Sequence, residues 1–116
     1  MSAKCVLVVE DEFLVALDME IVLGEAGFDV LGPAGSVEEA LRLIAGHQPA
    51  AALLDNNLNG ESVGPVAAAL SARHVPFAFV SGNDRTSLPS AFDHVLLVGK
   101  PFNSAHLVEV AISLTT

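Results

Sequence analysis

Polar side chains suited to phosphoryl chemistry follow four apolar segments of the sequence. Glu10 and Asp11 come directly after the first segment, Asp55 after a later one, and Ser81 and Lys100 at the ends of two more. Clustered carboxylates repel one another unless they are protonated or bind a cation, and Mg²⁺ prefers oxygen ligands of this type. A carboxylate beside such a cation can attack phosphorus, while an amine and a hydroxyl stabilise the phosphoryl oxygens. These residue types therefore indicate phosphoryl transfer to a carboxylate.

Each of these residues, taken alone, also has an ordinary structural interpretation. Asp is common in turns after strands, and acids are favoured in the first turn of a helix. We expect Glu12 to have only this second role. The four histidines are scattered without metal-ligand spacing, and the glycines form no nucleotide-binding fingerprint after the first strand. The chemical interpretation therefore depends on the fold bringing the strand ends together.

Apolar segments alternate with helical patterns along the chain. We expect strands at residues 5–9, 28–31, 50–54, 76–80 and 95–98, and helices at residues 12–26, 36–45, 61–73 and after an Asn103 cap. Residues 83–93 contain Pro, Ser, Thr, Asp and Asn, which predicts a loop with at most a short helical turn. This order predicts an α/β domain whose parallel strands end at one edge, where ligands bind in such folds.

Local signals refine three of these elements. In the first helix, the apolar stripe predicted from helical spacing contains Phe13, Leu14, Leu17, Ile21 and Val22. The second strand is expected to end at Gly32-Pro33. Ser36 and Glu39 form a capping-box pattern at the start of the second helix.

Composition limits the classes of function. The chain has 116 residues, 52% of them hydrophobic, which predicts one well-packed domain. A net charge of -9 disfavours binding to nucleic acid or anionic membranes and favours a basic partner. Without a long apolar run or a signal-peptide pattern, we expect a cytoplasmic protein. Cys5 is the only cysteine and is expected to be a small core residue.

Four motifs, taken in order, resemble the response-regulator receiver family of two-component signalling over nearly the whole chain. They are Val8-Val9-Glu10-Asp11-Glu12, Leu53-Leu54-Asp55 followed by Leu58-Asn59-Gly60, Val80-Ser81-Gly82, and Gly99-Lys100-Pro101-Phe102. The resemblance implies a flavodoxin-like three-layer sandwich with a five-stranded parallel sheet in the order 2-1-3-4-5. Residues 1–116 would form one receiver domain.

The resemblance also implies a function. The chain would be a stand-alone response regulator, a monomer or weak dimer, that accepts a phosphoryl group on Asp55 from a phosphohistidine. The donor would be a sensor histidine kinase or a histidine phosphotransfer protein, and the signal would pass to a downstream target through protein contacts. The domain would not be a conventional enzyme, although it would catalyse its own phosphorylation and slow dephosphorylation.

Site residues carry over one by one. Asp11 and Asp55 would bind Mg²⁺ or Mn²⁺ directly, Asn57 would contribute its backbone carbonyl, and Glu10 would act through a metal-bound water. Ser81 would bind a phosphoryl oxygen. Lys100 would pair with the phosphoryl group and precede a cis bond to Pro101.

The chain also departs from the family pattern at two positions. Leu97 stands where many members have an aromatic switch residue, and Asn59 where many have proline. The run from Pro76 to Gly82 resembles an alphaproteobacterial subgroup with an altered fourth-strand motif, so we expect a short or disordered fourth helix.

Other functions remain open. The chain could act as a phosphate sink, as a relay, or as a degenerate receiver that only binds partners. Phosphatases of the haloacid-dehalogenase type also use an aspartate nucleophile, but they have a second Asp where this chain has Asn57.

Overall fold

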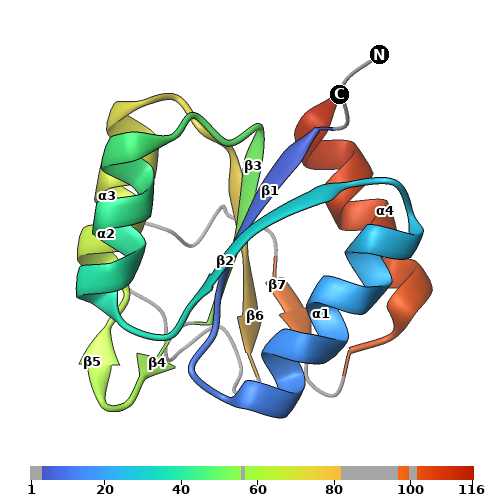
Figure 1. The fold of residues 1–116 in the computed structure, drawn as a ribbon, viewed down its shortest axis with the longest axis horizontal. Coiled ribbons are helices and arrows are strands. Elements are labelled where there is room, and N and C mark those ends of the chain that lie inside the picture. Colours follow the sequence, from blue (N-terminus) through green and yellow to red (C-terminus); the bar gives the residue numbers. More distant parts are fainter. Residues whose placement is uncertain (1–3, 56, 82–96, 100–101) are drawn as a thin grey trace.

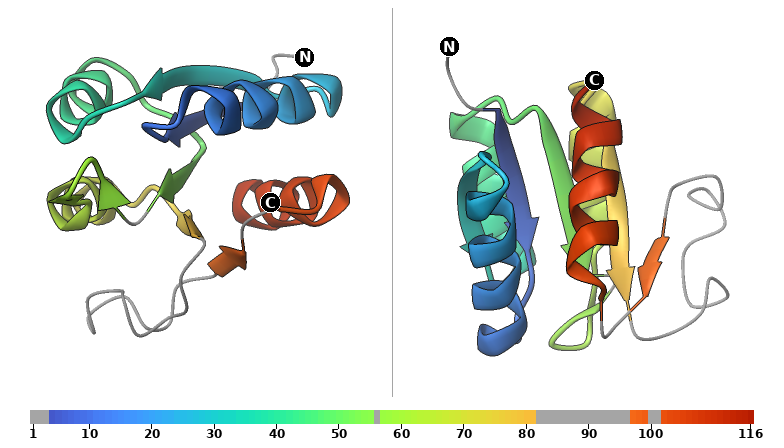
Figure 2. Two further views of the ribbon diagram at one scale, coloured as in Figure 1. Left: turned by 90° about the horizontal axis from the view of Figure 1, so that it is seen from below. Right: turned by 90° about the vertical axis from the view of Figure 1, so that its right-hand side faces the viewer.

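A computed structural model of the protein describes residues 4–55, 57–81, 97–99 and 102–116. Within these residues, one parallel sheet lies between two helical layers (Figures 1 and 2). Its strands are β1 (Cys5–Val9), β2 (Asp29–Ala34), β3 (Ala51–Asp55), β6 (Phe77–Ser81) and β7 (Leu97–Gly99). The helices are α1 (Phe13–Glu25), α2 (Val37–Gly46), α3 (Gly64–Ala72) and α4 (Ser104–Thr115). The strand order is β2-β1-β3-β6-β7, which is the predicted 2-1-3-4-5 when only this sheet is counted. The predicted fold class is confirmed.

Both faces of the sheet are covered, because strand side chains alternate between two cores. Leu7, Leu54 and Phe79 pack on the side that contains α2 and α3. Leu53 and Val80, with their neighbours, pack on the side that contains α1 and α4. The whole of β3 is buried, as expected for a central parallel strand. The two cores thus support the central strand ends from both sides.

The second strand continues past the predicted stop. Between Leu7 and Val9 of β1, the register with β2 shifts, so that Leu7 pairs with Leu31 and Val9 with Ala34. The extra residue is accommodated at Gly32, which has a φ of 96°, and at the cis bond between Gly32 and Pro33. A bulge therefore replaces the expected strand end, and the ladder resumes at Ala34.

The apolar stripe predicted for α1 does not form the buried face of this helix, and of its five residues only Val22 packs on the sheet. Phe13 and Leu14 are 76% and 75% exposed, and Leu17 and Ile21 are also exposed. The face that packs on the sheet instead contains the buried residues Ala16, Met19 and Leu23, together with the partly buried Val15 and Val22. Apolar residues surround most of this helix, so spacing alone could not distinguish the inner face from the outer one.

The helix caps predicted at Ser36 and Asn103 are both present. The Ser36 side chain accepts a hydrogen bond from the Glu39 N–H at 3.1 Å, while the Glu39 carboxylate accepts one from the Gly35 N–H at 2.8 Å. The capping box is therefore present with its return bond shifted by one residue. Asn103 caps α4 by accepting from the His106 N–H at 3.1 Å.

Several predictions fall outside the described residues. These are the loop at 83–93 and with it the short fourth helix, the start of the strand at 95–98, and the cis bond before Pro101. Among the residues that are described, no helix has the length and apolar character needed to cross a membrane.

Candidate acidic site at the strand ends

Strand register brings Glu10, Asp55 and Ser81 to one edge of the sheet. Val9 of β1 pairs with Leu54 of β3, so Glu10 and Asp55 are the next residues along two neighbouring strands. Asp55 in turn pairs with Val80 of β6, the residue before Ser81. Figure 1 shows that the N-terminal end of α1 lies at this same edge. The sheet topology thus brings strand ends that are distant in sequence to one edge.

Three carboxylates meet there. Glu10, Asp11 and Asp55 each offer an oxygen atom, and these atoms all lie within 4.8 Å of one another. Glu10 is 3% exposed and Asp55 7%, whereas Asp11 is partly exposed. Like charges at this separation repel, and burial weakens the screening by water. Such a cluster of oxygen donors is suited to a divalent cation.

Main-chain hydrogen bonds hold Glu10 in place. Its N–H donates to the Ala34 carbonyl at 2.8 Å, which joins the end of β1 to the end of β2. One carboxylate oxygen of Glu10 accepts from the N–H of Glu12 at 3.1 Å. Glu12 also directly precedes α1, so this contact ties the Glu10 side chain to the start of that helix.

A short antiparallel hairpin, which the sequence analysis missed, follows Asp55. It consists of β4 (Asn57–Leu58) and β5 (Glu61–Ser62), and its turn residues Asn59 and Gly60 both have positive φ. This is the conformation of a type I′ turn, for which Asn-Gly is a preferred sequence. The Asn59 N–H donates to an Asp11 carboxylate oxygen at 3.0 Å. The Asn-Gly pair was therefore the available signal. Because residues 61–62 belong to the hairpin, α3 starts at Gly64 rather than at the predicted Glu61.

Two further predicted site residues, Asn57 and Ser81, lie at the ends of strands. Asn57 is the first residue of β4, Ser81 is the last residue of β6, and Ser81 pairs with Gly99 of β7. Leu97, at the position of the aromatic switch, is the first residue of β7. Lys100 follows Gly99 in the sequence and lies outside the described residues.

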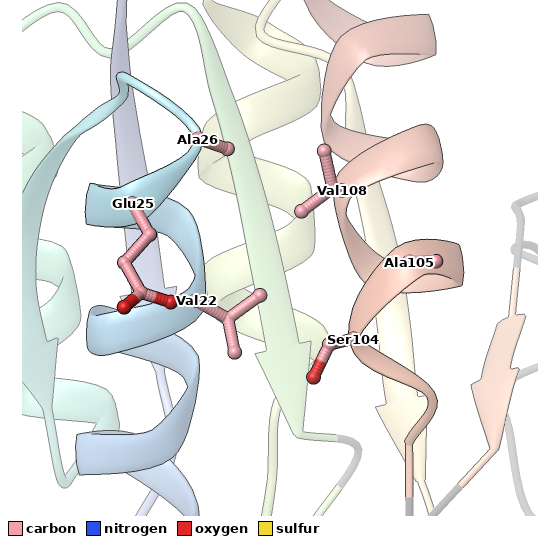
Figure 3. A pocket seen from close by; sticks show the side chains of 6 residues that line it. All are labelled: Val22, Glu25, Ala26, Ser104, Ala105 and Val108. Carbon is pink, nitrogen blue, oxygen red and sulfur yellow. The ribbon is translucent and has the colours of Figure 1, made fainter.

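A shallow groove opens elsewhere, between α1 and α4 (Figure 3). It has a volume of about 430 Å³ and is lined by Val22, Glu25, Ala26, Ser104, Ala105 and Val108. None of the three clustered carboxylates lines it. The acidic site is therefore separate from this groove.

Several known structures are similar to this chain in fold and in sequence. SdrG from Sphingomonas melonis Fr1 is 35% identical over the whole of both chains, with a TM-score of 0.87. A BeF3-activated conformation of SdrG from Pseudomonas melonis Fr1 gives 0.82 at the same identity. A response regulator receiver protein from Sinorhizobium medicae WSM419 is 25% identical and covers 97% of this chain and 94% of its own, with a TM-score of 0.85.

The chain belongs to the response-regulator receiver family. Among curated proteins, this receiver is 28% identical to the transcriptional regulatory protein PdtaR of Mycobacterium tuberculosis over 93% of its length. It spans only 56% of PdtaR, so it matches about half of that curated relative. No protein-family model matches the sequence.

Proposed function

We propose that this receiver accepts a phosphoryl group on Asp55 in a reaction that requires Mg²⁺, and that it signals through protein contacts. The observation that supports this most directly is the group of three carboxylates within 4.8 Å at the strand ends, two of them buried. A merely structural turn would not need to bring Glu10, Asp11 and Asp55 together, because their mutual repulsion costs stability.

The donor set fits a hard divalent cation. All the available ligand atoms are oxygens, and Mg²⁺ or Mn²⁺ binds such sets with waters completing the coordination. We assign direct binding to Asp11, Asp55 and the main-chain carbonyl of Asn57, and binding through water to Glu10. The cation would supply positive charge that offsets the repulsion between the carboxylates and an incoming phosphoryl group.

The proposed chemistry is a single displacement at phosphorus. A carboxylate oxygen of Asp55 attacks the phosphorus of a phosphohistidine, an O–P bond forms, and the N–P bond breaks. The released imidazole nitrogen takes up a proton from solvent. Ser81 donates its hydroxyl to a phosphoryl oxygen, and Lys100 contributes its positive charge. Slow attack by water later returns Asp55 and inorganic phosphate.

The exposed apolar face of α1 is the surface we assign to the phosphohistidine protein. Phe13, Leu14, Leu17 and Ile21 form this face, which begins two residues after Asp11. A donor histidine must reach Asp55, so its protein has to cover the surface next to the site. The exposed acids Asp18 and Glu25 on the same helix, and Glu12 directly before it, favour a partner with basic residues around an apolar patch. SdrG supports the general scheme, since BeF3 activates that relative and BeF3 is a phosphoryl mimic.

Phosphorylation in solution tests the proposal. The receiver is incubated with Mg²⁺ and a small phosphoryl donor such as acetyl phosphate, and acyl phosphate is detected by intact mass and by its lability in alkali. We expect one phosphoryl group per chain. No labelling should occur when EDTA removes Mg²⁺ before the donor is added, and none should occur in Asp55→Asn. Glu12→Gln removes a neighbouring exposed acid and should still be labelled. Labelling that persists in Asp55→Asn would overturn the assignment, and no labelling at all would favour a degenerate receiver.

A test of the proposed docking surface on α1 needs a second phosphoryl donor, one that is a protein. Leu14→Ser should slow transfer from a phosphorylated histidine phosphotransfer protein, because it removes apolar contact area. The same variant should accept phosphate from acetyl phosphate at the normal rate. Equal slowing with both donors would show that the substitution disturbs the site itself.

A further inference from the structure

The turn of the β4–β5 hairpin contacts the acidic site directly. In the hairpin, Leu58 pairs with Glu61 and Asn57 with Ser62, which leaves Asn59 and Gly60 as the two turn residues. The N–H of the first residue in such a turn points away from the ladder. Here that N–H donates to an Asp11 carboxylate oxygen 48 positions earlier in the chain, at 3.0 Å. The bond links the β1–α1 connection to the hairpin after β3.

The residue type at position 59 matters for this bond. Asn59 has a φ of 51°, a left-handed conformation that Asn tolerates better than most residues. Proline, which many receivers have here, is restricted to a φ near -65° and has no N–H to donate. A chain with proline at this position therefore cannot form the contact. The departure from the family pattern at Asn59 has a structural counterpart in the hydrogen bond to Asp11.

We propose that Asn59 is a positioning residue whose main-chain N–H orients the Asp11 carboxylate for cation binding. The proposal rests on the proposed function in one respect, namely that Asp11 is a metal ligand. With one oxygen held by the turn, the other remains available to a cation, and the carboxylate loses less rotational freedom when it binds. Hydrogen bonds to ligating carboxylates commonly change metal affinity by about 10- to 100-fold.

The hydrogen bond itself is tested without metal. In ¹³C,¹⁵N-labelled protein, the Asn59 amide should show a through-bond coupling to the Asp11 carboxylate carbon. Asp11→Ala should move the Asn59 amide proton upfield and speed its exchange with solvent about tenfold or more. Asp55→Asn removes one negative charge from the same cluster but not the acceptor, so it should leave Asn59 exchange unchanged. An Asn59 amide that is insensitive to Asp11→Ala would overturn the proposal.

The positioning role is tested by Mg²⁺ titration followed by NMR, with no phosphoryl donor present. Asn59→Gly keeps the N–H and tolerates positive φ, so its Mg²⁺ affinity should match the wild type. Replacing Asn59 by its α-hydroxy acid analogue exchanges only the N–H for an ester oxygen, and should weaken Mg²⁺ binding about tenfold. Equal affinity in the ester protein, or an equal loss in Asn59→Gly, would overturn the role.

These experiments distinguish a failure of the positioning role of Asn59 from a failure of the proposed function. If Asp55 is not phosphorylated but Mg²⁺ affinity still follows the Asn59 N–H, the phosphoacceptor proposal fails and the positioning role stands. If Asp55 is phosphorylated and the ester protein binds Mg²⁺ normally, the reverse holds. A wild-type protein that binds no Mg²⁺ at millimolar concentration would overturn both.

Discussion

The main-chain carbonyl of Ala34 accepts a hydrogen bond from the Glu10 N–H at 2.8 Å, across the ends of two neighbouring strands. Ala34 reaches this position because the bulge at Gly32 and Pro33 shifts the β1–β2 register before the strand ends. The backbone of a buried acid in the candidate site is therefore supported by an irregularity in the adjacent strand. β-Bulges are over-represented next to active sites.

Gly32→Ala should strongly destabilise the fold. Gly32 has a φ of 96°, and a Cβ added there would lie 2.8 Å from the Ala34 nitrogen and 3.0 Å from the Val8 carbonyl oxygen. Both contacts are with backbone, which cannot move aside without disturbing the β1–β2 ladder. We expect a loss of roughly 2 kcal/mol or more in the free energy of unfolding, measured by urea denaturation.

Gly24→Ala is the matched control for that substitution. Gly24 is an exposed residue inside α1, and a Cβ added there would meet nothing within 4 Å. Alanine has the higher helix propensity, so this variant should be more stable by about 0.5–1 kcal/mol. Two alanine substitutions with the same effect would contradict the structural role of the bulge.

The outer face of α1 should contribute little to stability. Leu14→Ser removes a side chain that is 75% exposed and should change the free energy of unfolding by less than about 0.5 kcal/mol. Leu23→Ala removes a fully buried side chain from the same helix and should cost about 2–5 kcal/mol. A comparable loss in both variants would mean that the two faces are assigned the wrong way round.

How far the sequence predicts the structure depends on how local each signal is. The sequence predicts that Glu10, Asp11 and Asp55 lie close together, because apolar runs indicate the strands and a parallel topology brings the strand ends to one edge. The inner face of α1 could not, because apolar residues such as Phe13 and Leu14 occupy its outer side as well. There the choice of face is made by tertiary packing on the sheet.

Two further errors have different physical causes. Gly32-Pro33 is a strong turn signal, and only pairing with β1 lets the strand continue through it as a bulge. The hairpin at Asn59 and Gly60, by contrast, has a recognisable local sequence, because Asn-Gly between two short strands is typical of a type I′ turn.

Stability should depend on the protonation of Cys5. Burial raises the pKa of the Cys5 thiol, and the charge of Asp29 on the paired strand raises it further. The folded state therefore binds this proton more tightly than the unfolded chain does. Its contribution is fully present below the unfolded pKa of about 8.5 and is lost as pH rises through the folded value.

Two variants check this dependence. The difference in unfolding free energy between wild type and Cys5→Ala should shrink as pH rises above about 8.5. Asp29→Asn should speed alkylation of Cys5 by iodoacetamide at pH 8, since it lowers the thiol pKa. A pH-independent difference, or unchanged alkylation, would contradict the assignment.

Mg²⁺ should reverse part of a stability difference between wild type and Asp55→Asn. Without metal, the variant lacks one of three carboxylates whose oxygens lie within 4.8 Å, so it should be more stable by about 1–3 kcal/mol. With Mg²⁺ at ten times its Kd, the wild type should gain about 1.4 kcal/mol, because only the folded state binds the ion. Asp55→Asn should gain much less.

Because the chain has no Trp or Tyr, unfolding is followed by far-ultraviolet circular dichroism in urea. Glu12→Gln, which removes an exposed acid beside the cluster, should show the full wild-type gain, and an equal gain in Asp55→Asn would count against metal binding at this site.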